Sequence, residues 1–338
     1  TVGGALSATA TAGNITDEVG GVLRITGAST FTAAGGQSIL LTEDSTFAAV
    51  TFVTSGGGSL ASVTINDSNA FELQALTLAG NLTVIAGDDI TDDGTITVAG
   101  DLAATTDAGD GVITLNQLAV AGSIALTTDG TGNATVVNDH ATGIEFAVSD
   151  VNRNLSATAT TGTITQSGAL DIEGTTTLVT AAQGQAIVLG TATNAFTGAV
   201  TITTNDNSSP GPVDGTYAAH VTIDGGTTQL RIAASTIDGD LTLTSGNASG
   251  IIDDGTVTVG RNLAATTNAS NGVINLGELA VTGSIALNTH NNGAATVVNA
   301  TGIEFAASTV GGAFSATATN GHITQTAALD ITGVTTIV

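Results

Sequence analysis

The stretch Asp92–Asn138 reads DDGTITVAGDLAATTDAGDGVITLNQLAVAGSIALTTDGTGNATVVN, and the stretch Asp253–Asn299 reads DDGTVTVGRNLAATTNASNGVINLGELAVTGSIALNTHNNGAATVVN. The two stretches align without a gap and are displaced by 253 − 92 = 161 positions. Self-similarity at a fixed displacement is the sequence signature of a repeat architecture, in which stacked copies build one continuous core. We therefore predict a repeat protein.

The copying extends beyond this pair of stretches. Thr1–Thr16 reads TVGGALSATATAGNIT and returns as Thr309–Thr324, TVGGAFSATATNGHIT, displaced by 309 − 1 = 308 positions. A looser copy lies at Val151–Thr165. We predict two large units and the start of a third within one continuous solenoid, with the bounds 1–149, 150–308 and 309–338.

The two large units differ in length mainly through one insertion. Val50 matches Val200 at a shift of 150, whereas Val63 matches Val221 at a shift of 158. The eight extra residues fall within 204–216, which contains both prolines of the chain. Loops on a regular scaffold are where proteins often place binding residues. The insertion is thus our candidate for a lateral contact, and a tolerated insertion without a role is the alternative.

Short alternating runs separated by Gly, Asp and Asn recur along the chain and predict strands joined by turns. A phrase of apolar residues alternating around a central glycine repeats at Gly80, Gly100 and Gly122, which are 20 and 22 residues apart. Repeats of about 20–30 residues built from short strands are typical of a β-solenoid. We predict an all-β fold, a parallel β-helix in tandem units of about 150–160 residues, right-handed by the crossover rule.

The central glycines admit two interpretations. Each could be a corner that needs a positive φ, or a small residue at an outward-facing bend. The second copy places Arg261 at the position of Gly100, and arginine tolerates positive φ poorly. We therefore favour the bend.

The composition excludes several classes of function. Charged residues make up only 10% of the 338 residues, the formal net charge is −25, and there is no cysteine, methionine or tryptophan. The negative charge argues against nucleic-acid binding, which requires a basic face that displaces counterions. It also argues against adsorption to anionic lipids, which attract basic segments. No apolar run is long enough to span a bilayer. The lack of cysteine fits an extracellular protein.

The phrases of the second large unit resemble the repeats of the filamentous haemagglutinin family, whose members are large secreted bacterial surface proteins and adhesins. The resemblance is carried by GQAIVLGTATNAFTGAVTITT at Gly184–Thr204 and by STIDGDLTLTSGNASGIIDDGTVTVG at Ser235–Gly260. It implies a right-handed parallel β-helix, export through an outer-membrane partner pore, and an adhesive or filament-forming role. The secretion domain of that family is not visible in the chain.

Aspartate is the main candidate for site chemistry. Three aspartates exchange with asparagine between the copies, which keeps a turn hydrogen bond and loses the charge, so we predict that most aspartates are turn formers. The exchanged pairs are Asp101 with Asn262, Asp107 with Asn268 and Asp110 with Asn271. The pairs that stay acidic in both copies are Asp92 with Asp93 and Asp253 with Asp254. Carboxylates in a turn are ligands that calcium prefers. These four residues are our candidate metal site, and turn formation is the alternative.

The sequence contains no catalytic motif. We therefore expect that the chain has no enzymatic activity and no cofactor other than this candidate calcium. The motifs of serine hydrolases, zinc proteases and phosphate-binding loops are all missing. Parallel β-helices can also act on polysaccharides, which requires clustered carboxylates for acid–base work. A β-helical enzyme that acts on polysaccharides is therefore a second, weaker alternative.

The leading hypothesis is a structural segment of an extracellular, fibrous or adhesive bacterial surface protein. The chain begins and ends within a repeat and shows no polar capping coil, and solenoids normally carry caps. We expect it to associate end to end, either with further copies of itself or with more of the same chain, and cell-surface or matrix glycans are candidate ligands. The first alternative is a calcium-dependent adhesion module of tandem β domains, for example β-sandwiches.

Overall fold

A computed structural model describes residues 1–107, 109–205 and 219–338. The chain divides into two compact units, residues 1–160 and 161–338, and each is described by itself. Every regular element of the described residues is a β-strand. None of them is a helix that could cross a membrane. The division follows spatial contacts, so the repeat boundaries after residues 149 and 308 stay a prediction.

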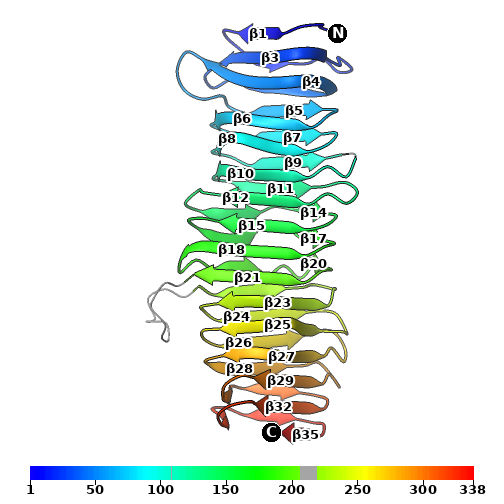
Figure 1. Ribbon diagram of the computed structural model, residues 1–338, viewed down its shortest axis with the longest axis vertical. Helices are drawn as coiled ribbons and strands as arrows, with labels where there is room; N and C mark the ends of the chain where they lie inside the picture. Colours follow the sequence, from blue (N-terminus) through cyan, green and yellow to red (C-terminus); the bar gives the residue numbers. More distant parts are fainter. Residues whose placement is uncertain (108, 206–218) are drawn as a thin grey trace. The chain divides into compact units, whose positions relative to one another are not determined.

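The described residues of unit 1 form fifteen strands (Figure 1). They are β1 (Leu6–Ala10), β2 (Ile15–Thr16), β3 (Arg24–Ala34), β4 (Ile39–Ser55), β5 (Val63–Asp67), β6 (Phe71–Leu78), β7 (Leu82–Ala86), β8 (Ile90–Val98), β9 (Leu102–Thr106), β10 (Ile113–Val120), β11 (Ser123–Thr127), β12 (Ala134–Asn138), β13 (Gly143–Phe146), β14 (Ser149–Val151) and β15 (Leu155–Ala159).

Unit 2 contains the strands from β16 to β35. They are β16 (Thr163–Gln166), β17 (Leu170–Ile172), β18 (Thr176–Gln183), β19 (Ile187–Leu189), β20 (Ala195–Phe196), β21 (Val200–Asn205), β22 (Val221–Asp224), β23 (Leu230–Ile237), β24 (Leu241–Ser245), β25 (Ile251–Val259), β26 (Leu263–Thr267), β27 (Ile274–Val281), β28 (Ser284–Asn288), β29 (Ala295–Asn299), β30 (Ile303–Phe305), β31 (Ser308–Val310), β32 (Phe314–Ala318), β33 (Ile323–Gln325), β34 (Leu329–Ile331) and β35 (Thr335–Ile337). The predicted insertion 204–216 lies outside the described residues from residue 206 onward.

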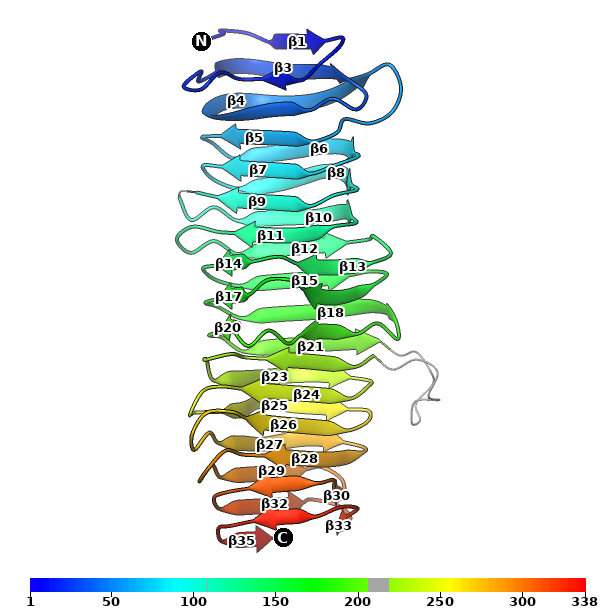
Figure 2. The ribbon, with the colours of Figure 1, turned by 180° about the vertical axis from the view of Figure 1, so that it is seen from behind.

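Each unit is a β-solenoid whose walls are parallel sheets, so the predicted fold class is confirmed. In unit 1 one wall runs β5–β7–β9–β11 and the opposite wall runs β6–β8–β10–β12–β15. In unit 2 the corresponding walls run β22–β24–β26–β28 and β21–β23–β25–β27–β29–β32–β35. Figure 2 shows the same stacking from behind. Parallel pairing rules out the β-sandwich alternative, because β-sandwich sheets are antiparallel.

The register explains the alternating sequence. Val63 pairs with Leu82, Leu82 with Leu102, and Leu102 with Ile124, and all four side chains are 0–1% exposed. Successive side chains of a strand point to opposite faces of the sheet. The alternate positions therefore form columns of aliphatic side chains inside the coil, and the Thr, Ala and Ser positions between them face outward.

The central glycines lie at close approaches between coils, and none of Gly80, Gly100 and Gly122 has a positive φ. A Cβ on Gly100 would lie 2.1 Å from the side-chain oxygen of Asn81, and a Cβ on Gly122 would lie 2.5 Å from the carbonyl oxygen of Gly100. The interpretation as bends without a left-handed backbone is confirmed. At these two positions of unit 1 the preceding coil leaves no room for a Cβ, whereas unit 2 accommodates Arg261 at the position of Gly100.

One carboxylate breaks the apolar pattern of the core. Asp67 ends β5 and is 1% exposed. Its carboxylate accepts hydrogen bonds from the backbone N–H groups of Phe47 (3.3 Å) and Asn69 (3.2 Å). Burial, offset in part by these two hydrogen bonds, raises the pKa of Asp67 to about 6, and the nearby charge of Asp44 adds to the rise.

The raised pKa of Asp67 predicts that unit 1 becomes less stable as the pH rises. The folded state binds the proton more tightly than the unfolded state, so the contribution of Asp67 is fully present below about pH 4 and is lost as the pH passes about 6. We expect Asp67→Asn to raise the stability above pH 7 by up to about 3 kcal/mol, because the amide keeps the acceptor oxygen without the charge.

The measurement is the urea unfolding midpoint of both proteins from pH 4 to 8. Asp44→Asn is the companion variant, and it should give a smaller gain of the same sign because it removes only the neighbouring charge. A constant difference between wild type and Asp67→Asn over this pH range would contradict the assignment.

Candidate functional site

The acidic pairs that both internal copies retain lie at matching bulges. Asp92 and Asp93 lie within β8, and Asp253 and Asp254 lie within β25. The register of both strands against the preceding coil shifts at this point. The next residue takes a positive φ in each copy, +137° at Gly94 and +147° at Gly255, a conformation that favours glycine. We call these two bulges, 92–94 and 253–255, the acidic corners.

The first aspartate of each acidic corner holds the backbone of the following coil. The Asp92 carboxylate accepts hydrogen bonds from the backbone N–H groups of Asn116 (3.1 Å) and Gln117 (2.8 Å). The Asp253 carboxylate accepts them from Gly277 (2.9 Å) and Glu278 (2.7 Å). In both copies the next strand also shifts register there. The carboxylate thus satisfies N–H groups that leave the regular ladder.

The second aspartate has different surroundings in the two copies. In unit 2, Asp254 accepts hydrogen bonds from the Nε (2.8 Å) and Nη2 (2.5 Å) atoms of Arg231 on the preceding coil. Arg231 is the second residue of β23, and the second residue of β6, its counterpart in unit 1, is Glu72. Asp93 therefore has no arginine at this position of the preceding coil.

The acidic corners offer little for a calcium ion beyond the aspartates themselves. Calcium takes six to eight oxygen ligands. Both oxygens of Asp92 and of Asp253 already accept backbone hydrogen bonds, and Asp254 is paired with Arg231. Among the described residues, no group of three or more Asp, Glu or His side chains could hold a metal ion. A calcium site at Asp92, Asp93, Asp253 and Asp254 stays a prediction, and the hydrogen bonds give the acidic residues a structural role.

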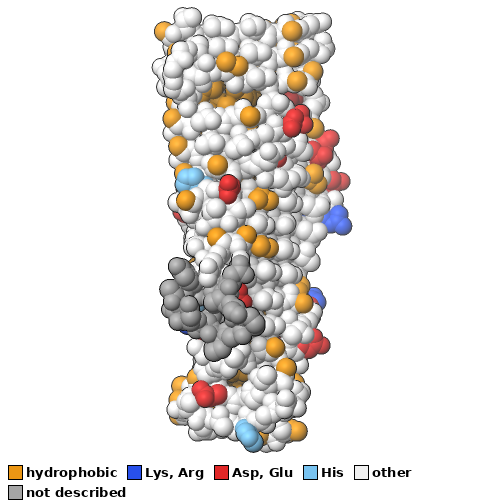
Figure 3. Space-filling view, turned by 60° about the vertical axis from the view of Figure 1, so that its left-hand side comes forward, with side chains coloured by type: hydrophobic (Ala, Val, Ile, Leu, Met, Phe, Trp, Pro, Cys, Tyr) orange, Lys and Arg blue, Asp and Glu red, His pale blue; other side chains and the backbone are white. Residues whose placement is uncertain are grey.

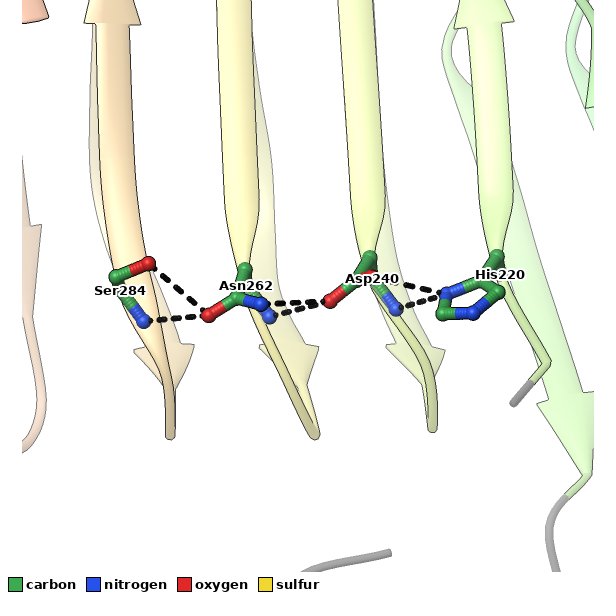
Figure 4. A network of polar contacts seen from close by, with 4 residues as sticks. All are labelled: His220, Asp240, Asn262 and Ser284. Atoms are coloured by element: carbon green, nitrogen blue, oxygen red, sulfur yellow. Dashed lines mark hydrogen bonds and ion pairs between the residues drawn. The ribbon is translucent and has the colours of Figure 1, made fainter. Parts of the chain in front are cut away.

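A ladder of polar side chains runs along the outside of unit 2, from His220 through Asp240 and Asn262 to Ser284 (Figure 4). The Nδ1 atom of His220 accepts a hydrogen bond from the backbone N–H of Asp240 (3.0 Å) and lies 3.1 Å from its carboxylate. The carboxylate accepts from the backbone and the side-chain nitrogen of Asn262, both at 3.0 Å. The Asn262 oxygen accepts from the backbone (2.9 Å) and hydroxyl (3.0 Å) of Ser284.

Unit 1 has a matching ladder through Ser62, Asn81, Asp101 and Ser123. The Asp101 carboxylate accepts from the backbone (2.8 Å) and hydroxyl (2.9 Å) of Ser123, the same two bonds that Asn262 accepts in unit 2. The interpretation of exchanged Asp and Asn as a retained acceptor oxygen is confirmed here, because the position requires an oxygen and not a charge.

The pair Asp110 and Asn271 shows the same exchange at a tight turn. Both residues have a positive φ, 63° and 61°, which Asp and Asn tolerate better than other side chains. Each side-chain oxygen accepts a backbone hydrogen bond from the following coil, Asp110 from Thr131 (2.7 Å) and Asn271 from Asn292 (3.1 Å). These residues are turn formers, as the sequence predicted for most aspartates.

Sequence reasoning missed two asparagines in the core. Asn138 and Asn299 end the repeated segment ATVVN and are 0% exposed. Each side-chain amide accepts a hydrogen bond from the backbone N–H of one valine of the preceding coil and donates one to the carbonyl oxygen of the same valine. This residue is Val120 for Asn138 and Val281 for Asn299, and the distances are 2.8–3.0 Å. The available signal was the asparagine retained at an otherwise apolar position in both copies.

The carboxylate of Asp253 should contribute to stability through its two backbone hydrogen bonds. We expect Asp253→Ala to lower the free energy of unfolding by about 1–3 kcal/mol, the range for hydrogen bonds to a charged group. Asp254→Ala is the matched control on the same corner, and it should cost at most about 1 kcal/mol because its ion pair is exposed. Urea unfolding of both variants measures the difference, and equal losses would contradict the role given to Asp253.

The same bonding predicts that the melting temperature does not change when EDTA is added, because backbone N–H groups already occupy the carboxylates. Thermal melts in EDTA and in millimolar calcium chloride measure this. A melting temperature that falls in EDTA, recovers with calcium, and loses this dependence in the double variant Asp92→Asn, Asp253→Asn would instead establish the calcium site.

Comparison with known proteins identifies a family of repeats. The model of the family "Repeats of unknown function (DUF5649)" matches residues 1–54, 60–127, 131–203 and 292–338. These segments make up more than half of the chain. No curated protein and no solved structure matches the chain. The chain, a β-helical repeat protein, belongs to the family of repeats of unknown function DUF5649.

Proposed function

We propose that this chain is a structural segment of an extracellular, fibrous or adhesive bacterial surface protein, without catalysis. The proposal is supported by the solenoid construction, in which the architecture of one coil is repeated in the next. It is also supported by the resemblance of Gly184–Thr204 and Ser235–Gly260 to the filamentous haemagglutinin repeats. The acidic composition with no lysine and no cysteine fits a secreted protein that stays soluble.

The observation that carries the proposal is the parallel stacking of one coil on the next, which continues to β35 of unit 2. Val297 pairs with Ala316 and Ala316 with Ile337, and the exposed fractions of these side chains are 0%, 0% and 54%. Val334 and Val338 of the same coil are 77% and 72% exposed. In the proposed fibre a coil of another copy stacks in the same way and pairs with β35, since an open strand edge templates strand addition.

Lateral attachment to cell-surface or matrix glycans is the second part of the proposal. The walls of both units present rows of Thr, Ser, Asn and Asp side chains at the surface. These groups donate and accept hydrogen bonds, as sugar hydroxyls require. The calcium-dependent adhesion module remains the alternative function, and it depends on the acidic corners. The polysaccharide-acting enzyme, the second alternative, would need paired carboxylates for acid–base work.

The fibre proposal predicts concentration-dependent end-to-end association of this chain. We expect Ile337→Lys to abolish it, because a charge on an edge strand opposes strand addition. Val148→Lys is the matched control, since Val148 is also an exposed aliphatic residue, at 69%, and belongs to unit 1. Sedimentation velocity measures the association, and electron micrographs of the associated material should give an axial reflection near 4.8 Å.

An isolated chain that stays monomeric at all concentrations would contradict association between copies. Association that Ile337→Lys and Val148→Lys reduce equally would place the contact elsewhere. Either outcome would contradict end-to-end association through the last coil of unit 2.

A further inference from the structure

The wall of unit 1 that contains β6, β8, β10, β12 and β15 is interrupted before β6, where the strand pairing does not continue to β4. The later part of β4 pairs with β3 on one side, from Ala49 with Ala28 to Ser55 with Ala34. β6 pairs with β8 and is the last strand of its sheet. On its other side an isolated parallel bridge joins Leu78, at its C-terminal end, to Leu60, so the open part of this edge is the part before Leu78. No strand pairing joins β4 to β6 in the described part of unit 1. Figure 1 shows β4 inclined to the strands that follow it.

Unit 2 shows what the uninterrupted arrangement looks like. Its equivalents of β4 and β6 are β21 and β23, and they pair directly through Val200 with Ile232 and Thr203 with Thr236. Val200 is the counterpart of Val50, and Ile232 is the counterpart of Leu73. Matching residues of the two units thus lie in these strands. The strands are paired in unit 2, whereas β4 and β6 are not paired in unit 1.

The open edge of β6 presents backbone hydrogen-bonding groups toward β4. Phe71 donates its backbone N–H to the carbonyl oxygen of Asp89, on the following coil (2.7 Å). In a parallel strand the backbone groups of successive residues point alternately to the two neighbouring strands. The N–H and C=O groups of Glu72 and Gln74 therefore point toward β4. Such a row is a template for another strand.

A cleft of about 360 Å³ lies along this edge. Its apolar lining includes Phe47, Val50 and Phe71, and these three side chains are 3–4% exposed. Figure 3 shows hydrophobic side chains in a hollow of the wall near the top of the view. Small residues of β4 line one side of the cleft, and both charged residues that line it, Asp67 and Glu72, are acidic. The ligand that fits is extended, with backbone groups to pair and a basic side chain.

We propose that the cleft between β4 and β6 binds an extended polypeptide segment carrying a basic residue, which pairs with the free edge of β6 and places its positive charge beside Glu72. The segment would add as a strand to the open edge of the sheet. Pairing with backbone gives such a site its affinity, and side chains at alternate positions give it selectivity. The site is independent of the proposed fibre contact, because that contact uses the last coil of unit 2.

The probe is a fluorescent peptide, acetyl-TVTKTVT-amide, titrated with the full chain at low salt and followed by fluorescence anisotropy. We expect saturable binding, and at least about tenfold weaker binding of acetyl-TVTETVT-amide, which brings a negative charge to an acidic cleft. Hydrogen exchange measured with and without the peptide should show the amides of Glu72 and Gln74 becoming protected.

The variant that blocks the edge is Gln74→Pro, which removes an N–H that points toward β4. We expect at least about tenfold weaker peptide binding, because one backbone hydrogen bond is lost and the ring obstructs the approaching strand. The matched control is Ala233→Pro, the counterpart in unit 2, where the same edge is already paired with β21. It should destabilise unit 2 and leave peptide binding unchanged.

Glu72→Gln tests the charge and keeps the fold, because Glu72 is exposed. It should weaken binding about threefold, as expected for an exposed ion pair, and should reduce its salt dependence. The proposal is overturned if the peptide does not bind saturably, or if binding is unchanged in a folded Gln74→Pro protein. If Gln74→Pro does not fold, unchanged exchange at Glu72 and Gln74, or unchanged affinity in Glu72→Gln, overturns it instead.

Discussion

The backbone hydrogen bonds between successive coils are the constraint on which the rest of this structure depends. Apart from the break between β4 and β6, the described strands pair in parallel with the strands of the next coil, so one position of the sequence meets its counterpart about twenty residues later. A residue that points inward in one coil must then point inward in all of them. The column from Val63 to Ile124 follows directly from this constraint. Because small branched side chains fill a narrow core, the chain needs neither tryptophan nor methionine.

The same stacking orders the outer surface. A side-chain oxygen at the start of one coil lies beside the backbone N–H at the start of the next, so a polar residue at this position satisfies its neighbour. Each four-residue ladder contains only one carboxylate, Asp101 in unit 1 and Asp240 in unit 2. Stacked carboxylates would repel at the strand spacing. Asn, Ser and His in the other positions supply hydrogen bonds without a second negative charge.

Departures from the regular ladder occur where the two copies use similar sequences differently. The acidic corner keeps its geometry in both copies, yet Arg231 pairs with the second aspartate in unit 2 and Glu72 stands at the same place in unit 1. The wall before it is closed in unit 2 and open in unit 1. The open edge and the acidic residue beside it coincide, so unit 1 differs from its copy in both hydrogen-bonding capacity and charge. A repeat protein can acquire a binding site in this way without changing its fold.

The fold class, the parallel stacking and the inward and outward positions could all be predicted from the sequence, because internal copies and a period of two constrain every coil in the same way. It also predicted that exchanged residues such as Asp110 and Asn271 act as turn formers. The roles of the retained residues became clear from the three-dimensional structure alone, because their partners lie one coil away. Asp92 holds the N–H groups of the next coil, Asn138 bridges to the preceding strand, and the glycines meet a neighbouring backbone. The break between β4 and β6 has no counterpart in the periodic pattern, since it arises from how two coils pack and not from which residues alternate.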